Sequence, residues 1–231
     1  MKNRVLIAED EKPISDIIKF NLEKEGYEII TAYDGEDALK KALNEQLERI
    51  ILDIMLPSMD GFEICKRVRE KSSVPIIMVT AKEEEVDKIL GLELGADDYI
   101  TKPFSIRELV ARVKANVRRQ EMNINADQQE KEIIKNKDLS IDLMKYEVKK
   151  GSTSIDLTVR EFELLKFLAK QKDQVFSREQ LLERVWGYEY YGDIRTVDVT
   201  VRRLREKVED DSSNPTYIMT KRGVGYYFKG E

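Results

Sequence analysis

The chain has 231 residues, of which 41% are hydrophobic and 37% charged, and its formal net charge is −5. It contains no histidine, which excludes His-based zinc sites, Ser-His-Asp and Cys-His catalysis, and a phosphohistidine of its own. Its single cysteine, Cys65, cannot form an internal disulfide, which fits a reducing cytoplasm, and no apolar run approaches the roughly 20 residues that span a bilayer.

The first 120 residues alternate between strand-like and helix-like patterns. Residues 13–26, for example, carry apolar side chains at helical spacing, begin with Pro13 and end with Gly26. The predicted strands are 4–10, 27–33, 49–53, 74–81 and 97–101, and the predicted helices are 13–26, 35–45, 61–71, 83–95 and 105–120. This alternation predicts an α/β doubly wound fold, with a five-stranded parallel sheet and helices on both faces.

The pattern changes after residues 121–130, which are polar and lack any period. Residues 138–157 read as short strands separated by turns, and 216–228 read as a hairpin with glycines at its turn. Three helices are predicted between them, over 158–171, 177–187 and 195–209. We therefore expect a first domain at 1–120, a linker at 121–130 and an α+β domain at 131–231.

Polar side chains follow four of the predicted strands of the first domain. Asp10, Asp53, Thr80 and Lys102 each lie at or just after a different strand end. Because the carboxyl ends of parallel strands meet at one edge of a sheet, we expect these groups to lie close together. Clustered carboxylates suit Mg²⁺, and a lysine beside them suits phosphoryl chemistry. The pattern predicts that Asp53 is a nucleophile that becomes an aspartyl-phosphate.

The helix at 195–208 carries the strongest local signal of the second domain. Its predicted buried stripe is Val197, Val201, Leu204 and Val208. Its opposite face carries Val199, Arg202, Arg203 and Glu206, flanked by Thr196, Thr200 and Lys207. The helix as a whole has five basic residues, namely Arg195, Arg202, Arg203, Arg205 and Lys207, against the two acids Asp198 and Glu206. The face predicts a helix that enters a DNA major groove, with Arg203 reading guanine and Val199 either contacting a thymine methyl or simply lying on the surface. Lys221 and Arg222, at the hairpin tip, are placed to reach an adjacent minor groove or the backbone.

Several motifs of the chain resemble those of a known family. The first domain resembles the receiver domains of two-component response regulators, which have a flavodoxin-like or CheY-like fold, in "AEDE", "LDIMLPSMDG", "VTAK" and "GADDYITKPF". The second resembles the winged helix-turn-helix effector domain of the OmpR/PhoB subfamily in "TVREFELLKFLA", "RTVDVTVRRLREKVE" and "RGVGYYF". The resemblance implies that Asp53 accepts a phosphoryl group from the histidine of a membrane or soluble sensor kinase.

The resemblance also implies roles for other residues of the first domain. Asp10, Asp53 and the Met55 carbonyl would bind Mg²⁺, with Glu9 acting through water. Lys102 would pair with the phosphoryl group beside a cis peptide bond to Pro103, while Thr80 and Tyr99 would turn inward on phosphorylation. The implied dimer pairs are Lys88–Glu108, Asp98–Arg112 and Asp97–Arg119, around an apolar centre of Ile89, Leu92 and Ala111.

For the second domain the resemblance implies contacts with promoter DNA and with RNA polymerase. Bases or grooves would be contacted by Val199, Thr200, Arg203 and Arg222. Phosphates would be held by Trp186, Arg195, Arg202, Arg205 and Thr220. The loop 187–193 would lie where relatives meet RNA polymerase.

Two other functions compete with a phosphorylation-controlled transcription factor. An aspartyl-phosphate enzyme of the dehalogenase type also places a nucleophilic Asp after an apolar strand. Such enzymes need a second acid two residues on, where this chain has Met55, and no insertion supplies a substrate cap. The other alternative is a receiver-like domain that binds DNA without phosphorylation, and the complete set of Asp10, Asp53, Thr80 and Lys102 argues against it.

Overall fold

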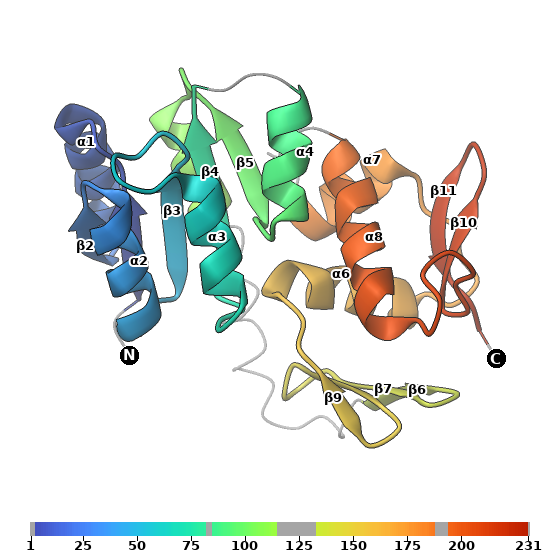
Figure 1. The fold of residues 1–231 in the computed structure, drawn as a ribbon. Helices are drawn as coiled ribbons and strands as arrows, with labels where there is room; N and C mark the ends of the chain where they lie inside the picture. Colours follow the sequence, from blue (N-terminus) through green and yellow to red (C-terminus); the bar gives the residue numbers. More distant parts are fainter. Residues whose placement is uncertain (1–2, 82–84, 115–132, 188–193, 231) are drawn as a thin grey trace. The chain divides into compact units, whose positions relative to one another are not determined.

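The structure is a computed structural model that describes residues 3–81, 85–114, 133–187 and 194–230 (Figure 1). The chain divides into two compact units, Met1–Ala111 and Arg112–Glu231, and each unit has its own hydrophobic core. The predicted linker at 121–130 and residues 188–193 of the predicted polymerase-contacting loop lie outside the described residues. Among the helices that the structure describes, none is long and apolar enough to cross a membrane.

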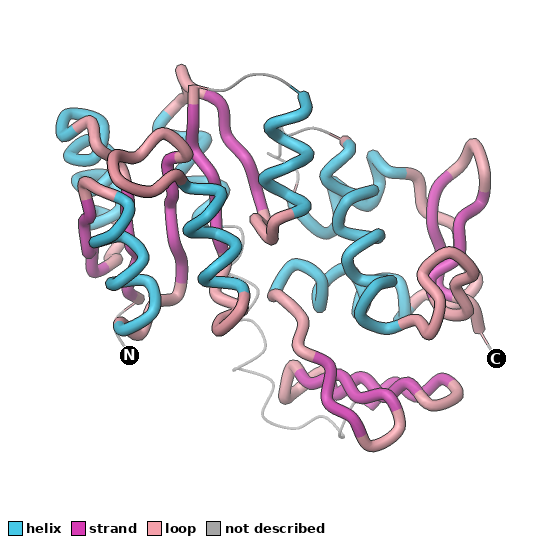
Figure 2. Tube along the Cα trace, in the orientation of Figure 1, coloured by secondary structure: helices cyan, strands magenta, loops and turns pink. Residues whose placement is uncertain are grey.

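The first unit is built on a parallel five-stranded sheet with the strand order β2-β1-β3-β4-β5. The strands are β1 (Arg4–Ala8), β2 (Glu28–Ala32), β3 (Arg49–Asp53), β4 (Ile76–Thr80) and β5 (Asp98–Thr101). They alternate with α1 (Lys12–Lys24), α2 (Gly35–Asn44), α3 (Gly61–Arg69), α4 (Glu85–Glu93) and a further helix described over 106–114. The α/β alternation predicted from the sequence is confirmed (Figure 2).

The middle residues of the central strands are apolar because helices cover both faces of the sheet. Every residue of β3 and β4 is buried, which is typical of a strand in a parallel sheet. Helices α2 and α3 pack against each other (Figure 1). The polar residues Asp53 and Thr80 end these strands, where the loops at the carboxyl edge begin.

Two helix starts fix the loops around that edge. The side chain of Asp34 accepts a hydrogen bond from Asp37 N at the start of α2, and Asp60 accepts one from Glu63 N at the start of α3. Gly61, the first residue of α3, lies so close to β3 that a Cβ atom there would collide with the carbonyl oxygen of Asp53. The backbone of α3 therefore begins in direct contact with the end of β3.

The second unit has a four-stranded antiparallel sheet, three helical segments and a hairpin. The sheet order is β6-β7-β8-β9, and the hairpin pairs β10 with β11. The strands are β6 (Ile133–Asn136), β7 (Leu139–Asp142), β8 (Glu147–Lys150), β9 (Thr153–Ile155), β10 (Ile218–Lys221) and β11 (Gly225–Phe228). The helices are α6 (Val159–Lys170), α7 (Arg178–Leu181), which continues as a π-helical turn over Leu182–Trp186, and α8 (Arg195–Val208). This is the winged helix domain predicted from the sequence.

Two helices of this unit start with reciprocal capping boxes. In α6 the Thr158 side chain accepts from Glu161 N, while the Glu161 side chain accepts from Thr158 N. In α7 Ser177 and Gln180 make the same pair of bonds. The hairpin is held by Glu209, whose carboxylate accepts from the backbone N–H groups of Thr216, Tyr217 and Ile218. The end of α8 thus fixes where β10 begins.

Candidate functional site

Three acids and a lysine meet at the carboxyl edge of the parallel sheet. Carboxylate oxygens of Glu9, Asp10 and Asp53 all lie within 4.8 Å of one another. Lys102 Nζ lies 2.6 Å from Asp53 Oδ2 and 2.8 Å from Glu9 Oε1. We call Glu9, Asp10, Asp53 and Lys102 the strand-end cluster. It joins residues that follow or end β1, β3 and β5, as expected for the edge where parallel strands end.

Burial strongly affects the charges of this cluster. Glu9 is 1% exposed, and burial raises its pKa to about 7, with a further increase from the charge of Asp53 and an opposing effect of its bond to Lys102. Burial alone would lower the pKa of Lys102, but its bonds to Asp53 and Glu9 outweigh this and raise it to about 12. Lys102 therefore remains a cation between two carboxyl groups.

The oxygen atoms of the cluster suit a hard divalent cation. Asp53 is 3% exposed, and its Oδ1 accepts from Met55 N at 3.0 Å. Asp10 is exposed at the mouth of the cluster, and the Met55 side chain points into solvent with 59% exposure. Oδ2 of Asp53 faces Lys102. An acidic cluster with carboxylate oxygens this close is consistent with a Mg²⁺ site, because Mg²⁺ prefers oxygen ligands.

Three further predicted residues lie on or just after β4 and β5. Thr80 ends β4 and is fully buried, and its carbonyl accepts from Lys102 N at 2.7 Å. The peptide bond between Lys102 and Pro103 is cis. Tyr99, on β5, is buried beside Gly91 of α4, and burial, together with the charges of Asp87 and Asp53, raises the pKa of its hydroxyl. The structure thus brings Thr80 and Lys102 together, and Tyr99 lies beside Met78 in the register of β4 and β5.

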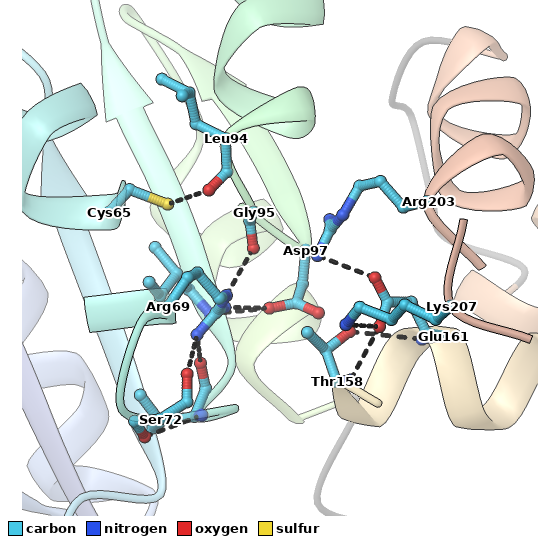
Figure 3. Close-up of polar contacts among 12 residues, drawn as sticks. Cys65, Arg69, Ser72, Leu94, Gly95, Asp97, Thr158, Glu161, Arg203 and Lys207 are labelled. Carbon is cyan, nitrogen blue, oxygen red and sulfur yellow. Dashed lines mark hydrogen bonds and ion pairs between the residues drawn. The ribbon is translucent and has the colours of Figure 1, made fainter. Parts of the chain in front are cut away.

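The predicted dimer face contains an internal ion pair that the sequence did not indicate. Arg69, at the end of α3, donates to the carbonyls of Gly95 and Val74 and, at 2.8 Å, to Asp97 Oδ2 (Figure 3). The same oxygen of Asp97 accepts from Ile76 N at 3.0 Å. Asp97 therefore ties the loop after α4 to α3 and β4.

The structure describes some of the other residues of that face and leaves others undescribed. Leu92 and Asp98 are buried, and Asp98 Oδ1 accepts from Tyr99 N at 2.7 Å. Glu108, Ala111 and Arg112 lie on the helix described over 106–114. The side chains of Lys88 and Ile89, and the whole of Arg119, lie outside the described residues.

In the second unit, α8 has the buried stripe that its period predicts: Val197, Val201, Leu204 and Val208 are buried. On the rest of the helix, Arg195, Arg202, Glu206 and Lys207 are exposed, and Arg202 and Glu206 form an ion pair at 3.5 Å. Thr196, Val199, Thr200 and Arg203 are buried, which differs from the expected open face. Thr200 Oγ1 donates to the Thr196 carbonyl, and Arg203 pairs with a glutamate of α6.

The remaining residues that are expected to contact DNA lie in different surroundings. Arg205 donates to the Ile218 carbonyl and to Thr220 Oγ1, so two predicted DNA-binding residues fix each other at the base of the hairpin. Lys221 and Arg222 are exposed at its tip, as expected. Trp186 instead belongs to the core of the unit, under the guanidinium of Arg160 at 5.0 Å from its ring. Packing explains Trp186, and its implied phosphate contact stays a prediction.

Each of the two units matches a known protein family. Residues 5–114 match the family model described as "Response regulator receiver domain", and residues 152–228 match "Transcriptional regulatory protein, C terminal". The response regulator DrrB of Thermotoga maritima, described as an OmpR/PhoB homologue, is 35% identical, with 100% of both chains covered and a TM-score of 0.53. A mutant of the protein RitR is 31% identical over 99% of this chain and 100% of its own, with a TM-score of 0.76.

A receiver domain joined to a winged helix DNA-binding domain defines a two-component response regulator. The chain belongs to the OmpR/PhoB family of these regulators. The family consists of transcription regulators rather than enzymes, so the phosphatase alternative is set aside. A receiver domain implies a histidine kinase as partner, and the C-terminal domain implies DNA binding.

Proposed function

We propose that Asp53 accepts a phosphoryl group from the phosphohistidine of a sensor kinase, and that the phosphorylated protein dimerises and binds promoter DNA. The observation that carries the proposal is the position of Lys102, whose Nζ lies 2.6 Å from Asp53 and 2.8 Å from Glu9 while Asp10 stays exposed beside them. A buried carboxylate next to a cation and two further acids suits nucleophilic attack on a phosphoryl group.

In the proposed reaction an oxygen of Asp53 attacks the phosphorus of the kinase phosphohistidine. The new O–P bond forms as the P–N bond breaks, and the imidazole leaves with a proton from solvent. Lys102 then pairs with the transferred group, and Thr80 and Tyr99 turn toward it. Asp10, Asp53 and the Met55 carbonyl would hold Mg²⁺, with Glu9 acting through water. When bound, Mg²⁺ neutralises charge on the phosphoryl oxygens.

Phosphoryl uptake by the Asp53→Asn variant tests this proposal. The full chain is incubated with a labelled small-molecule phosphodonor and Mg²⁺. We expect no label on Asp53→Asn, full label on the control Asp16→Asn, which changes an exposed acid on α1, and none on the wild type when Mg²⁺ is chelated. Label on Asp53→Asn at the wild-type rate would show that another residue is the acceptor. A wild type that never takes up label would favour the alternative in which phosphorylation plays no part.

The proposed dimer uses Lys88, Ile89, Leu92, Asp97, Asp98, Glu108, Ala111, Arg112 and Arg119. Joining two effector domains makes the second DNA contact nearly intramolecular, so affinity rises without new contacts. A polar linker allows the two domains to bind in tandem, and we expect a direct-repeat operator with half-sites about one helical turn apart. Asp97 is already bound to Arg69 and Ile76 N, so we expect it to contribute least to the interface.

On DNA, α8 is proposed to lie in the major groove with Arg203 reading a base. The hairpin tip, with Lys221 and Arg222 exposed, would reach an adjacent groove. The loop 187–193 is proposed to contact RNA polymerase. We place the protein in the cytoplasm, where its kinase partner and the DNA meet.

The motifs "TVREFELL" and "VWGYEYYGDIRTVDVTVRRLREK" resemble those of WalR (YycF), a cell-wall regulator of low-GC Gram-positive bacteria. On that resemblance we propose genes of cell-wall metabolism as targets. Selection of bound sequences from random DNA, with and without phosphorylation, tests this. Selected sites that are absent from promoters of cell-wall genes would overturn the target proposal and leave the regulator function standing.

A further inference from the structure

One acid of the second unit faces two cations of α8. Glu161 on α6 is completely buried. Its Oε1 lies 2.9 Å from Arg203 Nη2, and its Oε2 lies 2.7 Å from Lys207 Nζ (Figure 3). We call Glu161, Arg203 and Lys207 the glutamate bridge. All three residues belong to the same unit, and α6 and α8 pack against each other.

The position of Glu161 is fixed independently of α8. It is the third residue of α6, and its Oε2 accepts from Thr158 N at 2.9 Å in the capping box that begins the helix. The carboxylate is therefore anchored to backbone before it meets a basic side chain. A buried carboxylate that receives two ion pairs and a backbone hydrogen bond has a well-defined position.

The bridge restrains the orientation of Arg203. An arginine guanidinium carries its N–H groups in a rigid plane, and the ion pair between Nη2 and Glu161 fixes one end of that plane. The other carboxylate oxygen holds Lys207, which restricts the positions from which its ammonium group can contact DNA phosphates. A restrained arginine loses less conformational entropy when it binds a base, which favours the matched sequence.

We infer that Glu161 is a positioning residue for DNA sequence discrimination, which it exerts by holding Arg203 and Lys207. This inference rests on the proposed base contact of Arg203. It assigns a role in recognition to a residue of α6, which is outside the helix proposed to enter the groove. If it is correct, removing the charge of Glu161 releases two cations from their ion pairs, so binding to any duplex strengthens while discrimination falls.

The test uses the full chain with Glu161→Gln. In α7 the equivalent third position is occupied by Gln180, which completes a capping box with Ser177. We therefore expect Gln at position 161 to keep the hydrogen bonds that start α6. A matched duplex, selected from random DNA by the wild type, and a scrambled duplex of the same composition are titrated at several salt concentrations. Glu163→Gln is the control, because it removes the same charge from α6 at a residue bonded to Tyr146 and Lys166 rather than to α8.

For Glu161→Gln we expect discrimination between the two duplexes to fall by roughly tenfold. Scrambled-duplex binding should tighten, and the slope of log K against log salt should steepen by about one to two, as the released cations reach phosphates. Glu163→Gln should change neither. In an Arg203→Ala background, Glu161→Gln should cause no further loss of discrimination, because the arginine that it positions is gone.

A second variant keeps the inference testable if Glu161→Gln folds poorly. Glu161→Asp retains the charge but withdraws it by one methylene, so discrimination should fall without a steeper salt slope. Wild-type discrimination in both Glu161 variants, with a loss in Arg203→Ala, would overturn the role of Glu161 and leave the base contact intact. No loss in Arg203→Ala would instead overturn the proposed base contact itself.

Discussion

The strand-end cluster and the glutamate bridge are arrangements of opposite sign. In the receiver, Lys102 lies between the carboxyl groups of Glu9 and Asp53. In the effector domain, Glu161 lies between the cations of Arg203 and Lys207. Each central ion is shared by at least two partners of opposite charge, so each site retains an excess of one charge. The excess is negative where a divalent cation is proposed to bind and positive where DNA phosphates are proposed to bind.

The two arrangements also differ in how the chain assembles them. The strand-end cluster draws its members from the ends of three strands, and 93 residues separate Glu9 from Lys102. The glutamate bridge needs two packed helices, and Glu161 and Lys207 are 46 positions apart in the sequence. Parallel strands bring their ends together by topology, whereas helix packing decides which side chains face each other.

The largest expected effect comes from removing the central cation of the receiver. Lys102→Met leaves the buried carboxyl groups of Glu9 and Asp53 facing each other, and should lower receiver stability by about 3–5 kcal/mol without divalent cations. Adding Mg²⁺ should restore part of the lost stability. Thermal unfolding with and without Mg²⁺ measures this, with Lys40→Met, an exposed lysine of α2, as control. Equal loss in both variants would mean that Lys102 does not balance the cluster.

The second prediction concerns pH. The pKa of Glu9 rises from 4.5 to about 7 on folding, so the folded receiver binds more protons than the unfolded chain between these values. The contribution of Glu9 to stability is therefore full below about pH 4.5 and is lost as the pH rises through about 7, a change on the order of 3 kcal/mol. We expect urea unfolding over this pH range, without divalent cations, to show a weaker dependence of the free energy of unfolding on pH for Glu9→Gln than for the wild type. The exposed neighbour Glu11, changed to Gln, should keep the wild-type slope.

The third prediction separates two arginines of α8. Arg203→Ala should cost roughly 1–3 kcal/mol on a matched duplex and relax the preference at one base. Arg205→Ala should weaken matched and scrambled duplexes equally, because its bonds hold Ile218 and Thr220 rather than a base. Titration of both duplexes at one salt concentration measures the difference. Equal losses on both duplexes for Arg203→Ala would remove it as a base reader.

The smallest effects are expected at the dimer face. A single change such as Glu108→Ala should weaken the phosphorylated dimer by at most about 1 kcal/mol, because an exposed ion pair contributes little. Arg112→Glu should do more by placing like charges together, and adding Asp98→Arg should restore the dimer. Sedimentation of the phosphorylated protein measures all three. A wild-type dimer in Arg112→Glu would place the interface elsewhere.

Much of the fold and of the site can be predicted from the sequence, because the signals are periodic and local. The alternation of strands and helices in the first half predicts the parallel sheet, and the topology of such sheets then places Asp53 and Lys102 at one edge. The spacing of Val197, Val201, Leu204 and Val208 predicts the buried stripe of α8. The absence of histidine predicts that any phosphohistidine comes from a partner.

Only the tertiary structure decides which charges share a partner. Nothing near Arg69 in the sequence indicates that it binds Asp97, and nothing near Glu161 indicates that it faces Arg203. Both pairs depend on how elements far apart in the chain pack, and a single sequence carries no periodic signal for that. Helical spacing predicts that Arg203 lies opposite the buried stripe, but its ion pair with Glu161 depends on the contact between α6 and α8. A buried carboxylate such as Glu161 needs cations close enough to replace water.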